Sequence, residues 1–134
     1  MRIGSGGNNT VRGDAEFGGH FTGDVWIDHL ARPGEDTELS VQSVYFTPGS
    51  RTAWHAHPNG QIIHVVAGEG RIQQRGGDVQ TLKPEDTVIA PPGEWHWHGA
   101  APGASMTMIA VQQPDANGRL VEWAEPVEDE QHSA

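Results

Sequence analysis

The sequence contains no cysteine, so it can form neither a disulfide nor a thiolate metal site. Any metal that it binds must therefore take nitrogen or oxygen ligands. No window approaches the roughly 20 consecutive apolar residues of a membrane span. The start of the chain holds one arginine and no apolar run, unlike a signal peptide. Together these absences predict a cytoplasmic protein.

Basic residues are also scarce. The chain has 8 Lys and Arg against 18 Asp and Glu, which gives a formal net charge of −10. We expect such an acidic chain to bind neither nucleic acid nor an anionic membrane. Part of the acidic excess falls in residues 124–134, which we interpret as a solvated acidic tail rather than a docking motif.

Strong helix signals are missing as well. The 134 residues suffice for one domain with a real core, so we expect a single domain over residues 1–134. Its 18 glycines and 9 prolines indicate short strands joined by turns. The one expected helical turn follows Pro126. Residues 1–20, rich in Gly and Asn, are expected to be a loose N-terminal arm, or an arm held by something else.

Alternating or β-branched apolar segments predict an all-β fold. They indicate roughly ten strands at the spacing of an antiparallel sandwich or barrel. The clearest segments are 21–30, 39–46, 61–67, 87–90, 95–98, 106–112 and 119–123, with a hairpin of 71–75 and 79–82 around Gly76-Gly77.

Two histidine pairs are the strongest chemical signal: His55 with His57, and His96 with His98. Residues two apart on a strand point the same way, so each pair can reach one ion. Gln61 follows the first pair across a short turn and offers an oxygen. Imidazole suits Zn, Cu, Fe and Ni, and oxygen donors suit Mn. One His-x-His pair alone would be weak evidence, but two pairs with an oxygen donor predict a metal site.

The other histidines lack such a pattern. His64 has the opposite strand parity to Gln61, so we expect it to face away from the site. The remaining three are expected at the surface: His20, His29 and His132.

One face of the 106–112 segment is expected to line the barrel beside the metal. The candidate pocket residues from this strand and two others are Gln42, Val44, Ile63, Met106, Met108 and Gln112. An apolar pocket with a few polar groups is typical of small-molecule sites. Alternatively, the methionines are ordinary core filler. Three tryptophans of the opposite parity are expected in a second layer or an interface: Trp54, Trp95 and Trp97.

Gly49, His55, His57, Gln61 and Gly68 follow the spacing Gly, five residues, His-x-His, three residues, Gln, six residues, Gly. With Glu in place of Gln, this resembles the first motif of the cupin superfamily, whose members are double-stranded β-helix (jelly-roll) barrels. Their second motif is Gly, five residues, Pro-x-Gly, two residues, His, three residues, Asn. It matches Glu85, Pro91, Gly93, His96 and Ala100 here, so its first and last residues differ. The resemblance, over about residues 38–112, implies a jelly-roll barrel whose metal ligands are His55, His57, Gln61 and His96.

Four further stretches, FTGDVWID, TAWHAHPNGQ, PGEWHWHGAAP and VEWAEPVEDEQ, extend over nearly the whole chain. They resemble the bacterial cupin-type hydroxynitrile lyases, which are manganese-dependent and (R)-selective for mandelonitrile. This resemblance implies Mn(II) as the metal, with Fe(II), Ni(II), Co(II) or Zn(II) still open, and His98 as the catalytic base. Cupins commonly pair through sheet edges and exchanged N-terminal strands. We therefore expect a homodimer or higher homo-oligomer, with residues 21–30 and the tryptophans as a candidate surface.

Gln61 also bears on the reaction. A carboxamide leaves a divalent ion one unit more positive than a Glu ligand would, which favours polarising a substrate oxygen over dioxygen chemistry. The expected function is a metal-dependent lyase on a small-molecule substrate, splitting a cyanohydrin or similar α-hydroxy compound into aldehyde and cyanide, or joining them. His98 would take the hydroxyl proton. The open alternatives are a metal-dependent isomerase or dioxygenase, and a non-catalytic ligand-binding cupin.

Overall fold

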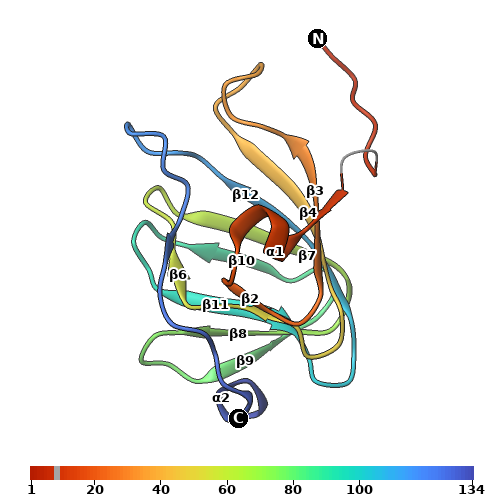
Figure 1. Cartoon of the computed structure of the whole chain (residues 1–134), viewed down its shortest axis with the longest axis vertical. Coiled ribbons are helices and arrows are strands. Elements are labelled where there is room, and N and C mark those ends of the chain that lie inside the picture. Colours follow the sequence, from red (N-terminus) through yellow and green to blue (C-terminus); the bar gives the residue numbers. More distant parts are fainter. Residues whose placement is uncertain (8–9) are drawn as a thin grey trace.

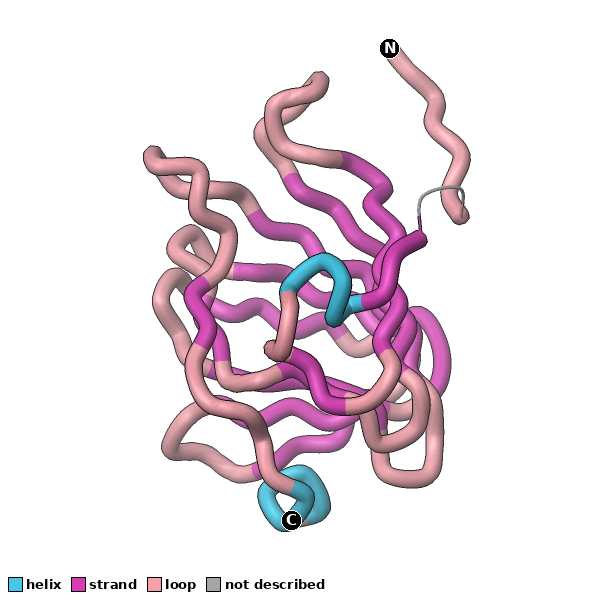
Figure 2. The backbone as a smooth tube through the Cα atoms, in the orientation of Figure 1, coloured by secondary structure: helices cyan, strands magenta, loops and turns pink. Residues whose placement is uncertain are grey.

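The computed structural model describes residues 1–7 and 10–134 and shows two antiparallel sheets that face each other as a barrel (Figures 1 and 2). The first sheet has the order β1 (Thr10–Arg12), β3 (Val25–Ala31), β4 (Ser40–Phe46), β12 (Met106–Gln112), β7 (Gln61–Gly68) and β10 (Thr87–Ala90). The second has the order β13 (Glu122–Trp123), β6 (His55–Ala56), β11 (His96–Ala100), β5 (Arg51–Thr52) and β2 (Phe21–Thr22), with β8 (Gly70–Gln74) on β11 and β9 (Val79–Leu82) on β8. The prediction of an all-β jelly-roll barrel is confirmed.

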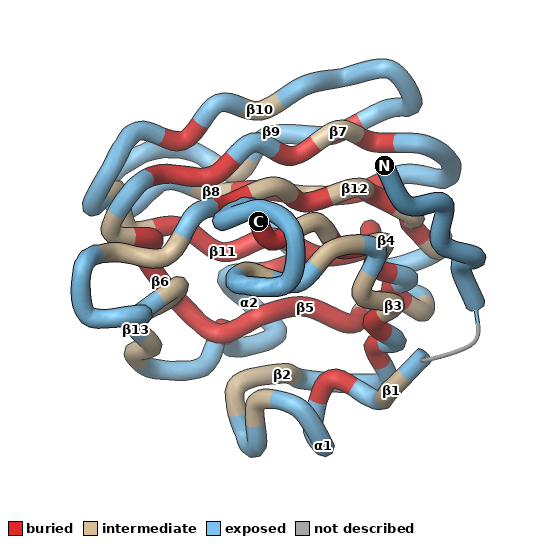
Figure 3. The backbone as a smooth tube through the Cα atoms, turned by 90° about the horizontal axis from the view of Figure 1, so that it is seen from above, coloured by how far each residue is buried: buried red, intermediate tan, exposed pale blue. Residues whose placement is uncertain are grey.

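Alternation along the strands builds the core between the sheets. On β12 the residues at 106, 108, 110 and 112 are buried and those between them are half-buried. On β3, Val25 and Ile27 are 2% and 1% exposed while Trp26 between them is 38% exposed, as their parity predicts. In the second sheet β5 and β11 are buried throughout, because the C-terminal segment covers their outer side (Figure 3).

Glycine sets two of the strand boundaries. The single strand expected over residues 21–30 is two strands, because the chain turns at Gly23 (φ 81°) and passes from the second sheet to the first. A Cβ at Gly23 would lie 2.8 Å from that of Ser50. Gly76 (φ 85°) turns the predicted hairpin between β8 and β9, which is confirmed.

The N-terminal segment is not a loose arm over residues 10–17. β1 pairs with β3, and α1 (Gly13–Phe17) follows directly. The ring of Phe17 lies 6.0 Å from that of Phe21 and 5.7 Å from that of Trp123, so the barrel itself holds this segment. One helical turn is too short to show a helical period in the sequence.

The C-terminal segment is not a free solvated tail either. It runs along the barrel from β12 to α2 (Asp129–Ser133), the expected helical turn after Pro126 (Figure 1). Val127 is 1% exposed, and Arg51 donates two hydrogen bonds to its carbonyl oxygen at 2.9 and 2.7 Å. The acidic side chains of this segment stay exposed, so the charge pattern predicts their exposure but not the docking of the backbone.

Two of the three histidines expected at the surface have side chains that are largely covered. His132 is 2% exposed, and its Nε2 lies 2.7 Å from the carbonyl oxygen of Ala100. The side chain of His29 is 7% exposed and its Nε2 lies 3.0 Å from a carboxylate oxygen of Glu16 on α1. His132 belongs to the C-terminal segment and His29 packs against the N-terminal one, and the sequence does not reveal the docking of either segment. Within residues 1–7 and 10–134, neither helix is long and apolar enough to cross a membrane.

Candidate metal centre

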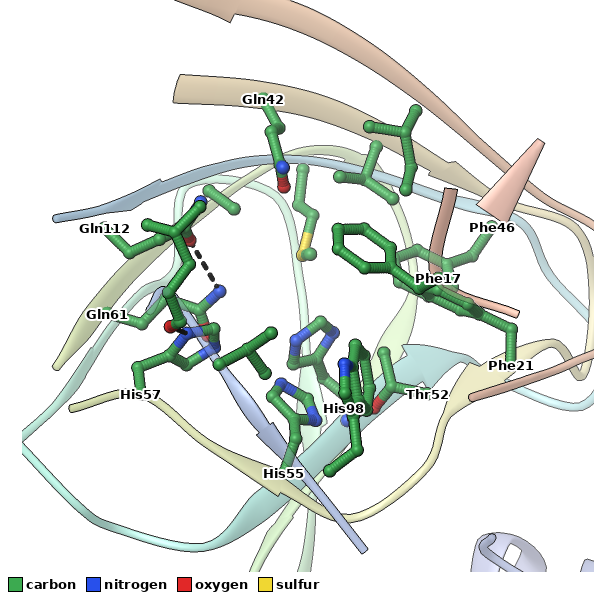
Figure 4. A pocket seen from close by; sticks show the side chains of 17 residues that line it. Phe17, Phe21, Gln42, Phe46, Thr52, His55, His57, Gln61, His98 and Gln112 are labelled. Atoms are coloured by element: carbon green, nitrogen blue, oxygen red, sulfur yellow. Dashed lines mark hydrogen bonds between the residues drawn. The ribbon is translucent and has the colours of Figure 1, made fainter. Parts of the chain in front are cut away.

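The two histidine pairs meet inside the barrel. His55 on β6 is the register partner of His96 on β11, and their ring centroids are 4.5 Å apart. His98, two residues further along β11, has its ring 5.1 Å from that of His55. The ring of His57 is also 5.1 Å from the ring of His55 (Figure 4). Period-two alternation therefore brings all four imidazoles into one cluster, as the sequence predicts.

One candidate nitrogen from each of His55, His96 and His98 lies within 4.8 Å of the other two. This triad contains the residue expected to be the base and leaves out His57, which was expected to be a ligand. The ring of His57 is 5.8 Å from the ring of His96, on the side of the cluster where Gln61 lies. Distance alone therefore does not separate ligands from base, and the hydrogen bonds of each ring must be considered.

Backbone carbonyls hold three of the four rings in one tautomer. The contacts are His55 Nδ1 to Ala53 O at 2.9 Å, His57 Nδ1 to Leu120 O at 2.8 Å and His96 Nδ1 to Glu94 O at 3.2 Å. A carbonyl oxygen only accepts, so each Nδ1 is the protonated donor and each Nε2 keeps its lone pair. Metal-binding histidines are oriented by such bonds from their second nitrogen.

Gln61 and His96 bring two acceptors together. Gln61 Oε1 lies 3.1 Å from His96 Nε2, yet the proton of neutral His96 is on Nδ1. Burial, followed by the neighbouring His57, lowers the pKa of His96 to about 4, so the ring is neutral at pH 7. Two donor atoms bound at right angles to one ion at about 2.1 Å lie about 3.0 Å apart. The pair thus fits a shared cation.

His98 differs from the other three. Both its ring nitrogens are buried, and neither has a hydrogen-bond partner among the described residues. Its backbone N–H donates to Thr52 Oγ1 at 3.2 Å, which fixes the strand but leaves the ring without an anchoring carbonyl. Burial, followed by the neighbouring His96 and His57, lowers its pKa well below the usual range. His98 is therefore a neutral imidazole with a lone pair facing the site.

Within this cluster, the other unpartnered nitrogen among the described residues is His57 Nε2. A buried polar atom without a partner is costly, so its persistence beside the Gln61–His96 pair indicates a missing ligand. Burial also lowers the pKa of His57, and burial followed by the neighbouring histidines lowers the pKa of His55 well below its usual range. The site is therefore a set of neutral nitrogen and oxygen donors, which fits one divalent cation.

A pocket opens above this cluster, and its wall is largely apolar. Four of the six predicted pocket residues line it: Gln42, Val44, Met108 and Gln112 (Figure 4). Ile63 and Met106 do not. Both are 0% exposed and belong to the core cluster, and Met106 packs against Gly70 towards the far end of β12. Both side chains point to the inner face of the sheet, as their strand parity predicts. Their positions along the strands place them in the core rather than at the pocket.

The sequence prediction missed the rest of the wall. Ile27, Phe46 and Ala110 add to it from β3, β4 and β12, and the other residues come from both terminal segments and from β5: Phe17, Phe21, Thr52, Leu120, Val121 and Trp123. Apart from Thr52, the residues from β5 and the terminal segments are distant in sequence from the histidines, so no local spacing connects them. The one available signal was the four-residue spacing of Phe17 and Phe21 in a stretch otherwise rich in glycine.

Residues of opposite parity lie outside the site, as expected. His64 is on the outer face of β7, with a 42% exposed side chain and its Nδ1 2.8 Å from Thr87 Oγ1. Trp54 and Trp97 pack with Val127 in a second cluster beneath the C-terminal segment. Trp95 lies at the edge, with the Arg75 guanidinium 5.7 Å from its ring centroid.

Comparison with known proteins agrees with this geometry. The family model for the Cupin domain matches residues 42–112. A protein named (R)-mandelonitrile lyase from Granulicella tundricola is 45% identical over 131 residues, 98% of this chain and 95% of that protein. The crystal structure of a cupin-like protein from Thermotoga maritima has a TM-score of 0.82 and 36% identity, covering 98% of this chain and 95% of the other. A cupin-2 domain from Rhodospirillum rubrum (TM-score 0.72, 16% identity, 98% and 82% covered) shares the fold.

Proposed function

The chain belongs to the cupin family, and from that premise we propose that it is a metal-dependent lyase of the hydroxynitrile lyase type. Its substrate would be a cyanohydrin or a similar α-hydroxy compound, split into an aldehyde and cyanide or formed from them. The position of His98 supports this proposal most strongly. An unanchored neutral imidazole lies beside a set of convergent lone pairs, at the base of an apolar pocket. The relative from Granulicella tundricola, named (R)-mandelonitrile lyase, supports the same reaction.

We assign His55, His57, Gln61 and His96 as the metal ligands and His98 as the base. The three assigned histidines each have Nδ1 held by a carbonyl and Nε2 left for a cation. His98 has no such anchor, so its ring is free to take up a proton and turn. In the rival assignment His98 is a ligand in place of His57, because the three closest nitrogens belong to His55, His96 and His98. The anchoring pattern favours His57.

A divalent cation held by these residues would supply a Lewis acid that makes a substrate hydroxyl more acidic and stabilises the resulting oxyanion. His98 accepts the hydroxyl proton. The O–H electron pair becomes the second bond of the carbonyl, and the pair of the breaking C–C bond leaves with cyanide. Cyanide then takes the proton from His98, which releases hydrogen cyanide and returns the neutral ring. Addition runs through the same steps in reverse.

The pocket wall provides binding and shields the site from water. Phe17, Phe21 and Trp123 stand together, with ring centroids 5.7–6.0 Å apart, and Phe46 meets the ring of His98 edge-on at 5.7 Å. Such a wall suits the apolar substituent of an aryl or alkyl aldehyde. The carbon that carries the hydroxyl would then face His98.

Mn(II) is the metal that we propose. Three imidazoles and one carboxamide oxygen form a mixed donor set that tolerates several first-row ions, and the oxygen donor suits manganese. Elemental analysis of the purified protein identifies what it carries. Cleavage of mandelonitrile, followed as benzaldehyde release after reloading with each divalent metal, tests the reaction. Tight binding of small aldehydes without turnover under any metal would instead favour a binding cupin.

We further propose that two copies associate through the outer face of the first sheet. A cross-strand row of apolar side chains runs over four strands there: Val41, Val111, Ile62 and Ile89. Ile62 is 46% and Ile89 76% exposed, on a chain whose charge of −10 disfavours self-association through charged surfaces. The substitution Ile62→Lys should give a monomer by light scattering, whereas Lys83→Glu, outside the row, should not. A monomeric native protein would contradict the proposal.

A further inference from the structure

Ser40, Gln112 and Gln61 form a cross-strand row at one end of the first sheet. Ser40 begins β4, Gln112 ends β12 and Gln61 begins β7, and Gln112 is the register partner of both others. The three residues are 1%, 6% and 6% exposed. Buried polar groups of this kind have to find partners within the protein, and here they find them in one another.

The hydrogen bonds in the row have a direction. Gln112 Nε2 donates to Ser40 Oγ at 2.9 Å. This leaves Gln112 Oε1 to accept from Gln61 Nε2 at 3.0 Å (Figure 4). With its NH₂ group occupied in this way, the Gln61 carboxamide presents Oε1 to His96 Nε2. Gln112 and Ser40 thus determine which end of the Gln61 amide faces the histidines.

The opposite direction is chemically available. A serine hydroxyl both donates and accepts, and an amide can turn end over end. In the reversed row Ser40 would donate to Gln112 Oε1, Gln112 would donate to Gln61 Oε1, and the Gln61 NH₂ group would face His96. That arrangement satisfies every partner in the absence of a cation, but it repels one. The observed direction is the one suited to binding a cation.

We propose that Ser40 and Gln112 are positioning residues that hold the Gln61 carboxamide with its oxygen towards the metal ligands. The proposal rests on the metal site assigned above. It extends that assignment, because the orientation of the oxygen ligand then depends on Ser40 and Gln112 as well as on Gln61. Second partners that orient metal ligands typically contribute 10- to 100-fold in metal affinity.

Carboxylates at the two Gln positions test the direction of the row, because a carboxylate only accepts. In Gln61→Glu, Gln112 can turn to donate to the new carboxylate while Ser40 donates to Gln112. In Gln112→Glu, both Gln61 and Ser40 can donate to the carboxylate. Each single variant therefore keeps a complete row. The double variant places two acceptors of like charge opposite each other with no proton between them.

The experiment is a double-mutant cycle on Mn(II) affinity, measured at about pH 8 by competition with a coloured chelator on the full-length protein. The matched control is Gln42→Glu. Gln42 lines the same pocket and is 8% exposed, and no hydrogen bond joins it to Gln61 within the described chain (Figure 4). Gln61→Glu with Gln112→Glu should bind Mn(II) at least about tenfold more weakly than the single variants predict. The change in Mn(II) affinity of the double variant Gln61→Glu with Gln42→Glu should agree within about threefold with the product of the two single-variant changes.

Equal coupling energies in the two cycles would overturn the proposal. Gln112→Leu is expected to bind Mn(II) about 10- to 100-fold more weakly than the native protein, and native affinity in this variant would also overturn the proposal. Thermal unfolding of each metal-free variant shows whether the fold is intact. If Gln112→Leu does not fold, the two double-mutant cycles with carboxylate substitutions still test the proposal. If the native protein binds no Mn(II), the metal assignment fails. If it binds Mn(II) and both cycles are additive, only the row fails.

Discussion

The Nδ1 of His57 lies 2.8 Å from the carbonyl oxygen of Leu120, and this bond joins a candidate metal ligand to the C-terminal segment 63 residues later. The same segment supplies Val121 and Trp123 to the pocket wall. Its hold on the barrel depends on Arg51, which is 5% exposed and binds the carbonyl oxygen of Val127. Ligand orientation and pocket closure are therefore both tied to one terminal segment.

Loosening that segment should weaken the metal site from a distance. In Arg51→Met the carbonyl of Val127 loses both donors, and Mn(II) affinity should fall about tenfold because His57 loses its orienting carbonyl. Chelator competition measures it. Asp129→Asn is the control, since that carboxylate also meets Arg51 but its side chain is 91% exposed. Unchanged affinity in Arg51→Met would show that the segment does not position His57.

Acid should destabilise the metal-free protein. The folded-state pKa of His96 is lowered to about 4, chiefly by burial, and burial also lowers the pKa values of His55 and His98 well below their usual range. Below the unfolded-state value near 6.5 the unfolded chain binds more protons, so the free energy of unfolding falls as pH falls from about 6.5 towards 4. His96 alone contributes a loss of about 3 kcal/mol over that window.

Urea unfolding of the metal-free protein at a series of pH values between 7 and 4.5 measures this slope. His96→Asn should unfold with a shallower pH dependence, because it removes one of the groups that protonate only in the unfolded chain. A native profile that is flat over this range would mean that the histidines are not buried as neutral rings.

Glu85 should be a removable source of strain. It is the one non-glycine residue with positive φ (77°) in the described chain, at the position where the second cupin motif has glycine. The left-handed conformation costs a non-glycine residue about 1–2 kcal/mol, and the extra backbone freedom of glycine when unfolded offsets about 0.5–1 kcal/mol. Glu85→Gly should therefore stabilise the protein by about 0.5–1 kcal/mol in urea unfolding.

Glu85→Ala is the control for that substitution. Alanine keeps the Cβ that makes this conformation costly, so it should bring no such gain. An equal gain in both variants would attribute the effect to the lost carboxylate, whose contact with His64 at 3.8 Å is exposed.

The aromatic wall should govern substrate size rather than metal binding. Phe17→Ala removes one ring that lines the pocket from α1, and kcat/KM for mandelonitrile should fall about 10- to 100-fold, mainly through KM. A small aliphatic cyanohydrin should lose much less. Steady-state kinetics on both substrates give the comparison, with Mn(II) content as the check. An equal loss on both would point to a disturbed site instead.

The sequence predicted the site best where one strand period decides the outcome. His55, His57, His96 and His98 cluster because residues two apart share a face, and His64 faces outward for the same reason. Parity gave Ile63 and Met106 the right side of the sheet but not their depth, which depends on where the strands cross. Depth is set by tertiary packing that local spacing does not record.

Contributions from the two ends of the chain could not be predicted in this way. Phe17, Trp123 and the Leu120 carbonyl reach the site through docking of segments that look polar or glycine-rich in sequence. His132 was expected at the surface, yet it is buried against Ala100 by the same docking. Each of these contacts joins segments too far apart in sequence for a local pattern to link them.

Metal content measured beside turnover shows whether His98 is the base and His57 a ligand. His98→Ala should keep about one Mn(II) per chain by elemental analysis and lose about 10²- to 10⁴-fold in kcat for mandelonitrile cleavage. His57→Ala, prepared in parallel, should lose the metal. Loss of the metal from His98→Ala, with His57→Ala still loaded, would make His98 the ligand and contradict both assignments.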